Sequence, residues 1–141
     1  MRILIEQAID ELDHKALTET LAFSTPLARE TNPTILKIIN ILKDHFDFVI
    51  KPESYWRIEH KPVGHGWHID TGTNNHMMWC QVGCSILLTS TQEFTGGRTF
   101  YDQENPVETK RDKYDIAAHS SDEWHMVESH TGNRIVLLIF I

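Results

Sequence analysis

The sequence predicts a mainly β protein, a jelly roll of two facing sheets preceded by helices that cover a sheet. Two observations lead to this fold class. Residues 10–46 place apolar side chains at helical spacing, whereas the chain from residue 47 onward consists of short β-prone runs separated by turn residues. About eight short strands after helices are typical of a double-sheet jelly roll. The length of 141 residues fits one domain, and we expect a helical part over residues 1–46 and a β part over residues 47–141.

The first expected helix begins at Asp10 or Asp13, either of which can cap a helix, and runs towards Phe23. Ser24-Thr25-Pro26 ends it. Residues Ile3–Ile5 are β-prone, and the sequence leaves open whether they form a short strand or lead directly into this helix. Four side chains would form the inner face of the helix: Leu12, Ala16, Leu17 and Leu21.

A second helix is expected to begin at Asn32-Pro33, where a cap residue precedes proline at the first helical position. The apolar residues that follow fall at helical spacing, which indicates a packing surface and not a ligand site. They are Ile35, Ile38, Ile39, Leu42 and Phe46.

The β part is expected to contain about eight strands. Segments rich in Gly, Pro and Asn separate them, such as Thr95-Gly96-Gly97 and Thr131-Gly132-Asn133. The most apolar run, Ile135–Ile141, is far too short to cross a bilayer and is typical of a strand buried on both faces. The expected strands are Phe48–Ile50, Tyr55–Glu59, Trp67–Asp70, Val82–Ser90, Thr99–Tyr101, Tyr114–Ala118, Trp124–Val127 and Arg134–Phe140.

Composition and charge narrow the classes of function. A net charge of −7 argues against a phosphate-binding surface, so nucleic acid is not an expected partner, although a local basic groove within the acidic total stays open. If Cys80 and Cys84 share a strand, their Cα atoms lie roughly 13 Å apart, too far for a disulfide. The N-terminus has no basic region followed by an apolar run. We therefore expect a cytoplasmic protein without a membrane segment, and the oligomeric state is left open.

The most informative stretch is Gly66-Trp67-His68-Ile69-Asp70. Alternate side chains of an extended segment point to the same face, so His68 and Asp70 can reach one point in space. A second histidine, His125, comes from far down the chain. Two imidazoles and one carboxylate on one face of a metal form the arrangement of non-haem Fe(II) oxygenases. Nine residues after His125, Arg134 is a permanent cation that can hold a carboxylate through two parallel hydrogen bonds.

From about Tyr55 to the C-terminus, the chain resembles the Fe(II)- and 2-oxoglutarate-dependent dioxygenases, and most closely the prolyl-hydroxylase-like branch of that superfamily. The resemblance implies a double-stranded β-helix core, a cupin-like jelly roll, that holds Fe(II) at His68, Asp70 and His125. It also implies that Arg134 binds the distal carboxylate of 2-oxoglutarate. The motifs that carry the resemblance, in the correct order, are His68-Ile69-Asp70, Gly96-Gly97-Arg98-Thr99-Phe100, His125-Met126-Val127 and Gly132-Asn133-Arg134.

The resemblance further implies a reaction that consumes O2 and 2-oxoglutarate, hydroxylates a substrate C–H and releases succinate and CO2. Halogenating relatives lack the carboxylate that Asp70 provides, so hydroxylation is expected here. The substrate would be a side chain of a protein or peptide, with proline as one candidate, or a small molecule. Leu87 and His65 stand where relatives often carry tyrosines, which leaves the second anchor of the oxoacid and the identity of the substrate open.

Two other functions stay open: a non-catalytic jelly roll that binds a metal or a small ligand, and a cupin-type hydrolase or isomerase that uses Zn or Mn. The fold alone does not separate them, because such barrels host many functions. Arg134 distinguishes the oxygenase from the two alternatives, since neither alternative requires a cation at that spacing. The sequence does not decide whether His60 and His65 line the pocket. The remaining histidines are interpreted as surface residues: His14, His45, His76, His119 and His130.

Overall fold

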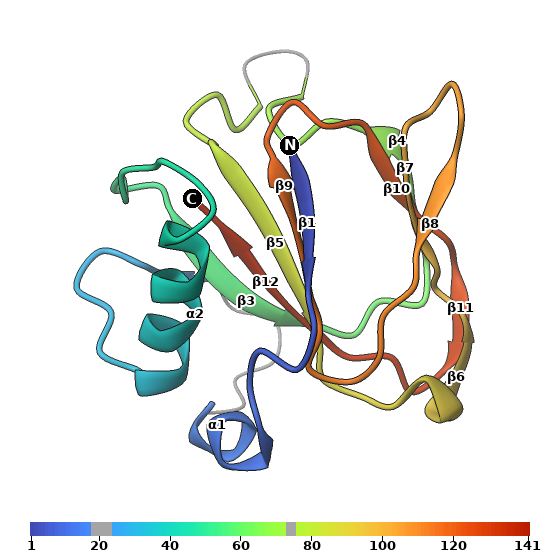
Figure 1. The fold of residues 1–141 in the computed structure, drawn as a ribbon, viewed down its shortest axis with the longest axis horizontal. Coiled ribbons are helices and arrows are strands. Elements are labelled where there is room, and N and C mark those ends of the chain that lie inside the picture. Colours follow the sequence, from blue (N-terminus) through green and yellow to red (C-terminus); the bar gives the residue numbers. More distant parts are fainter. Residues whose placement is uncertain (18–23, 73–75) are drawn as a thin grey trace.

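The computed structural model describes residues 1–17, 24–72 and 76–141. This part of the chain is mostly β, with antiparallel strands and few helices (Figure 1). The helices are α1 (Glu11–Ala16), α2 (Pro33–Lys43) and the 3₁₀ turn η1 (Thr91–Glu93).

The strands form two main sheets and a small one. In Figure 1 the four-stranded sheet lies across from the six-stranded sheet, and α2 lies on the side of β3 that faces away from the four-stranded sheet. The six-stranded sheet has the order β1 (Arg2–Ile5), β9 (Ile116–Ser120), β5 (Val82–Leu87), β12 (Val136–Phe140), β3 (Tyr55–Glu59) and β2 (Thr25–Pro26). The four-stranded sheet has the order β4 (His65–His68), β10 (His125–Val127), β7 (Thr99–Tyr101) and β8 (Val107–Thr109). The small sheet pairs β11 (His130–Gly132) with β6 (Phe94–Gly96).

Strand alternation gives the six-stranded sheet two different faces. On β3, Trp56 and Ile58 are buried in the hydrophobic core that also contains the apolar side of α2. Arg57 and Glu59 alternate with them and line a cavity between the two main sheets. The neighbouring strands contribute to the same core through Cys84, Ile86, Ile116, Ala118, Leu137 and Ile139. One face of the sheet therefore supports the fold, and the other is free to carry polar side chains.

Helix α2 begins where the sequence places it. The side chain of Asn32 accepts hydrogen bonds from the N–H groups of Thr34 at 3.0 Å and Ile35 at 3.3 Å, and Pro33 is the first helical residue. The apolar stripe expected from Ile35 to Phe46 is buried in the core.

Helix α1 differs from the expectation. Asp10 caps it, but the helix ends at Ala16 because Leu17 takes an extended conformation. The expected inner face does not form on so short a helix: Leu12 is 74% exposed, Ala16 is also exposed, and Leu17 is buried. The rest of that prediction lies outside the described residues, namely Leu21 and the expected end at Phe23.

The expected strand Phe48–Ile50 is absent from the described structure. The N–H and C=O groups of Val49 bond to the side-chain amide of Gln81, at 3.3 and 2.9 Å, and not to a neighbouring strand. Conversely, β2, β6, β8 and β11 were not expected. Each has only two or three residues, too few for an alternating pattern to show. Ile3–Ile5, which the sequence left open, belongs to β1.

Two other predicted strands are shifted for identifiable reasons. The strand expected at Trp67–Asp70 is observed as β4, which ends at His68. Asp70 is not part of the sheet, because its N–H donates to the carbonyl of Ser121 at 3.0 Å. The strand expected at Tyr114–Ala118 is observed as β9, which begins at Ile116. Tyr114 cannot belong to it, because its φ of 75° lies outside the β region.

Within the described ranges, no helix combines the length and the apolar character needed to cross a bilayer. Cys80 and Cys84 are both buried and free; only Cys84 lies in a strand, β5, so the spacing argument for a shared strand does not apply.

Candidate metal centre

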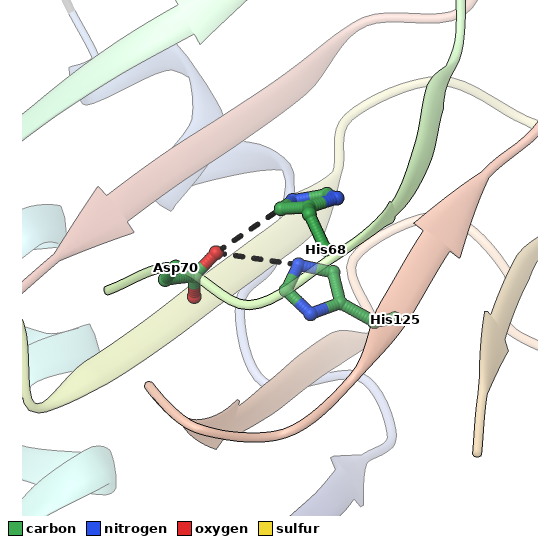
Figure 2. Close-up of side chains that lie close together, drawn as sticks. All are labelled: His68, Asp70 and His125. Atoms are coloured by element: carbon green, nitrogen blue, oxygen red, sulfur yellow. Dashed lines mark ion pairs between the residues drawn. The ribbon is translucent and has the colours of Figure 1, made fainter. Parts of the chain in front are cut away.

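Three of the predicted side chains meet where β4 pairs with β10. His68 ends β4 and His125 begins β10, and the two residues are direct partners in the antiparallel register. Asp70 follows two residues after His68, so its carboxylate faces both rings (Figure 2). The Nε2 atoms of His125 and His68 lie 3.3 and 3.9 Å from the same oxygen, Oδ1 of Asp70. One ligand atom from each residue falls within 4.8 Å of the others. The fold thus brings the three residues to one point.

Backbone carbonyls orient both imidazoles. Nδ1 of His68 lies 2.6 Å from the carbonyl oxygen of Gly66, and Nδ1 of His125 lies 2.9 Å from that of Glu123. A carbonyl oxygen only accepts hydrogen bonds, so each Nδ1 donates, and a neutral ring keeps its lone pair on Nε2. Both lone pairs then face the Asp70 carboxylate. Two nitrogens and one carboxylate oxygen turned towards one point fit a divalent transition metal such as Fe(II).

Burial and hydrogen bonding act in opposite directions on these groups. Burial favours neutral Asp70, but the hydrogen bond from His119, and a second one from His125 whenever that ring is protonated, outweigh burial and hold the pKa of the carboxyl below its ordinary value. Burial lowers the pKa of His68, which favours the neutral ring that a metal needs. Burial also opposes protonation of His125, but the Asp70 carboxylate outweighs it and raises the pKa of this imidazole. A proton and a metal ion therefore compete for Nε2 of His125.

His119 belongs to this site, and its interpretation as a surface residue is wrong. It lies in β9, is 6% exposed, and places Nε2 at 2.7 Å from Oδ2 of Asp70 and Nδ1 at 2.8 Å from the hydroxyl of Tyr101. The error came from ending the predicted strand at Ala118. A strand one residue longer puts His119 on the same face as Ala117, which lines the cavity.

Other histidines also depart from the sequence interpretation. His130 is buried, because the short strand β11 pairs with β6 and its ring stacks on His60 with centroids 6.0 Å apart. His14 is half-buried, and its Nδ1 lies 2.7 Å from the hydroxyl of Tyr114. His65, which the sequence left undecided, lines the cavity.

Arg134 is buried beside the same cavity, although it carries a charge. It is 7% exposed, it lies two residues before β12, and no carboxylate of the described residues lies within ion-pair distance of it. Its Nε is buried without a hydrogen-bond partner. Gly97 makes room for it, since a Cβ there would lie 2.5 Å from Cδ of Arg134. Burial lowers the pKa of this guanidinium. A buried cation without a partner is costly, so an anion is the ligand that this position fits.

Two further cavity residues were not predicted. Arg111 donates to the carbonyl oxygen of Ser85 at 2.7 Å and to its Oγ at 2.9 Å, and burial, with the nearby charge of Arg134, lowers the pKa of Arg111 to about 10. Thr99 holds a buried hydroxyl without a hydrogen-bond partner among the described residues. In the sequence, Arg111 stands within Lys110-Arg111-Asp112-Lys113, which looks like an ordinary solvated loop. No sequence signal distinguished it.

The fold is shared with solved structures of oxygenases. The chain is similar to an oxidoreductase of the 2OG-Fe(II) oxygenase family from Burkholderia pseudomallei, with a TM-score of 0.63 and 18% sequence identity, over 99% of this chain and 82% of that one. It is also similar to a prolyl 4-hydroxylase from Phytophthora capsici, with a TM-score of 0.54 and 16% identity, over 99% of this chain and 46% of that one. The chain thus spans about half the length of the second protein. No protein-family model and no curated protein matches the sequence. At these identities the likeness shows a common fold.

Proposed function

We propose that the protein is an Fe(II)- and 2-oxoglutarate-dependent dioxygenase that hydroxylates a C–H group of its substrate. The observation that carries this proposal is one cavity lined by His68, Asp70 and His125, which could hold a metal, and by the buried guanidinium of Arg134, which has no anionic partner among the described residues. A metal-binding jelly roll or a hydrolase needs the triad but not the guanidinium.

The strand order supports a double-stranded β-helix as the scaffold. The chain passes back and forth between the two main sheets through eight strands, with only the fourth and fifth following each other in one sheet; in chain order they are β3, β4, β5, β7, β8, β9, β10 and β12. The first, eighth, third and sixth lie side by side in the larger sheet, and the second, seventh, fourth and fifth in the smaller one. This interleaving is that of a jelly roll, in which residues distant in the sequence meet between the sheets. The similarity to oxygenase structures supports the same scaffold.

Residues of this chain would hold the metal and leave part of its surface free. His68, Asp70 and His125 supply two nitrogens and an oxygen from one side, and the His68 side chain is 40% exposed, so the centre is open to the cavity mouth. Bound Fe(II) would supply the redox chemistry that uses O2 and the oxoacid to oxidise a C–H bond. On a bound metal, Asp70 would take the place that a halide needs, which supports hydroxylation as the outcome.

The cavity also suits a dicarboxylic oxoacid. Within the described part of the chain, Arg134 Nε and Thr99 Oγ1 are buried donors without partners, and a carboxylate accepts from both kinds of group. Arg111 lies beside the same cavity and adds a second positive charge. With 2-oxoglutarate bound, the balanced reaction converts a substrate C–H, O2 and 2-oxoglutarate to the hydroxylated substrate, succinate and CO2. A protein or peptide side chain, proline among the candidates, or a small molecule is the proposed acceptor.

The experiment that tests this proposal is anaerobic addition of Fe(II) and then 2-oxoglutarate to the purified protein. We expect a weak visible charge-transfer band that needs both additions, followed by succinate when air is admitted with a pool of candidate peptides and metabolites. His68→Ala removes the band and the succinate. Arg98→Gln, which removes an exposed guanidinium paired with Glu128, leaves both unchanged. Absence of the band and of succinate from the wild-type protein contradicts the proposal.

A further inference from the structure

Asp70 offers its two carboxylate oxygens to different partners. Oδ1 faces His125 at 3.3 Å and His68 at 3.9 Å, whereas Oδ2 lies 2.7 Å from Nε2 of His119. The imidazole of His119 is in turn held by the hydroxyl of Tyr101, 2.8 Å from its Nδ1. We propose that His119 and Tyr101 are positioning residues that fix Asp70 as a ligand through one oxygen only. This inference rests on the proposed metal centre.

The direction of each hydrogen bond follows from chemistry. An ionised carboxylate only accepts, so Nε2 of His119 donates to Oδ2 of Asp70. In a neutral ring Nδ1 is then an acceptor, and the hydroxyl of Tyr101 is the group that can donate to it. Both hydrogen bonds thus point towards the carboxylate. The three residues are 5%, 6% and 2% exposed for Asp70, His119 and Tyr101, so no bulk water competes for these bonds.

Gly83 shows that the fold reserves space for this contact. It lies in the buried strand β5 and is the direct neighbour of His119 in the register with β9. A Cβ at this position would overlap Oδ2 of Asp70 and would lie 2.7 Å from Nε2 of His119. The backbone of Gly83 is not in the left-handed region, so its conformation does not call for glycine. The space it leaves is what allows the carboxylate and the imidazole to meet.

The consequence for the metal is geometric. A carboxylate with both oxygens free can rotate and chelate a metal ion through both, which occupies a position that an incoming ligand needs. With Oδ2 bonded to His119, Oδ1 alone is turned towards the two histidine nitrogens. Outer groups that hold a ligand in this way typically change metal affinity by about ten- to 100-fold when removed.

The test uses Co(II), which is stable in air and has visible absorption that reports its coordination. We expect His119→Leu to weaken Co(II) binding by about tenfold or more and to change the absorption spectrum. His119→Gln, whose amide N–H can replace the lost donor, restores most of the affinity and the wild-type spectrum. Tyr101→Phe causes a smaller loss than His119→Leu, because it removes only the support of the imidazole.

The matched control is Tyr114→Phe, which removes another tyrosine–histidine hydrogen bond, 2.7 Å long to His14, away from the cavity. It leaves Co(II) affinity and spectrum unchanged. Thermal unfolding of each metal-free variant identifies any that fails to fold. Wild-type affinity and spectrum in His119→Leu, or no recovery in His119→Gln, overturn the positioning role while His68→Ala still abolishes binding. Unchanged Co(II) binding in His68→Ala overturns the proposed metal centre itself.

Discussion

At the scale of single residues, the site depends on which atoms are left without partners. His68 and His125 each donate the Nδ1 hydrogen to a backbone carbonyl. The lone pair on Nε2 of each neutral ring therefore faces Asp70. Arg134 and Thr99, which line the same cavity, each have a buried donor with no partner among the residues that the structure describes. Acceptors gathered at one place fit a cation, and donors gathered at another fit an anion.

Arg134 and the metal triad should be separable by mutation. Arg134→Gln is expected to weaken 2-oxoglutarate binding by about ten- to 100-fold, because a charge-assisted hydrogen bond to a carboxylate contributes about 1.5–3 kcal/mol. Metal affinity should stay close to that of the wild type. Titration of 2-oxoglutarate into the Fe(II)-loaded protein under nitrogen, beside a metal titration, measures the two quantities. An equal loss of both would mean that Arg134 has a structural role.

Arg111 should matter less than Arg134 for the same ligand. It already donates to Ser85, so its charge acts on an anion mainly through space. We expect Arg111→Gln to lower 2-oxoglutarate affinity by about tenfold or less, and to change little the weak binding of 2-oxobutyrate, which lacks the distal carboxylate. Calorimetry with both oxoacids makes the comparison. A similar loss for the two ligands would place the effect elsewhere than at the distal carboxylate.

The sequence could predict some of these residues but not others. His68, Asp70, His125 and Arg134 stand in a recognisable order and spacing, and the fold brings all four to one cavity. Arg111 gave no such signal, and His119 was missed because the predicted strand ended one residue before it. The role of His119 depends on the pairing of β9 with β5 and on the space at Gly83, and a local sequence pattern predicts neither.

At the scale of elements, the pairing of β4 with β10 sets the site. It makes His68 and His125 direct partners, and the chain then leaves the ladder so that Asp70 can turn back to them. Longer strands with clear alternation, such as Tyr55–Glu59, were predicted with their observed bounds. The short strands β6, β8 and β11 were missed because tertiary pairing, not local propensity, makes them strands.

Strand β5 provides a direct test of this arrangement. Gly83→Ala is expected to separate Asp70 from His119, to destabilise the protein by about 1–3 kcal/mol as overpacking does, and to weaken metal binding. Gly66→Ala is the matched control, since a Cβ there meets no atom within 4 Å. Chemical denaturation and a Co(II) titration of both variants are the measurements. Equal behaviour of the two variants would show that the space at Gly83 is not needed.

At the scale of the whole molecule, net charge and local charge differ in sign. The chain carries a net charge of −7, yet Arg111 and Arg134 lie in one cavity without carboxylate partners among the described residues. Net charge could therefore argue against a nucleic-acid surface but could not reveal an anion site. The six-stranded sheet has a different role on each face. Its apolar face packs on α2, and its polar face lines the cavity.

The buried histidines should also make the stability of the metal-free protein depend on pH. The pKa of His130 is lowered by burial and by the charge of Arg134, so the unfolded chain takes up a proton that the folded one does not. This favours unfolding as the pH falls below the ordinary histidine pKa of about 6.5. Between pH 7 and 5, His130→Gln should therefore lose less stability than the wild type in urea unfolding. An equal or larger loss in the variant would contradict this assignment.

The most direct test of the whole account is a crystal structure grown with Mn(II) in place of Fe(II) and with 2-oxoglutarate. We predict an anomalous peak bounded by Nε2 of His68, Oδ1 of Asp70 and Nε2 of His125, with the far carboxylate of the oxoacid on Arg134. A peak elsewhere, or an oxoacid that does not reach Arg134, would contradict the account.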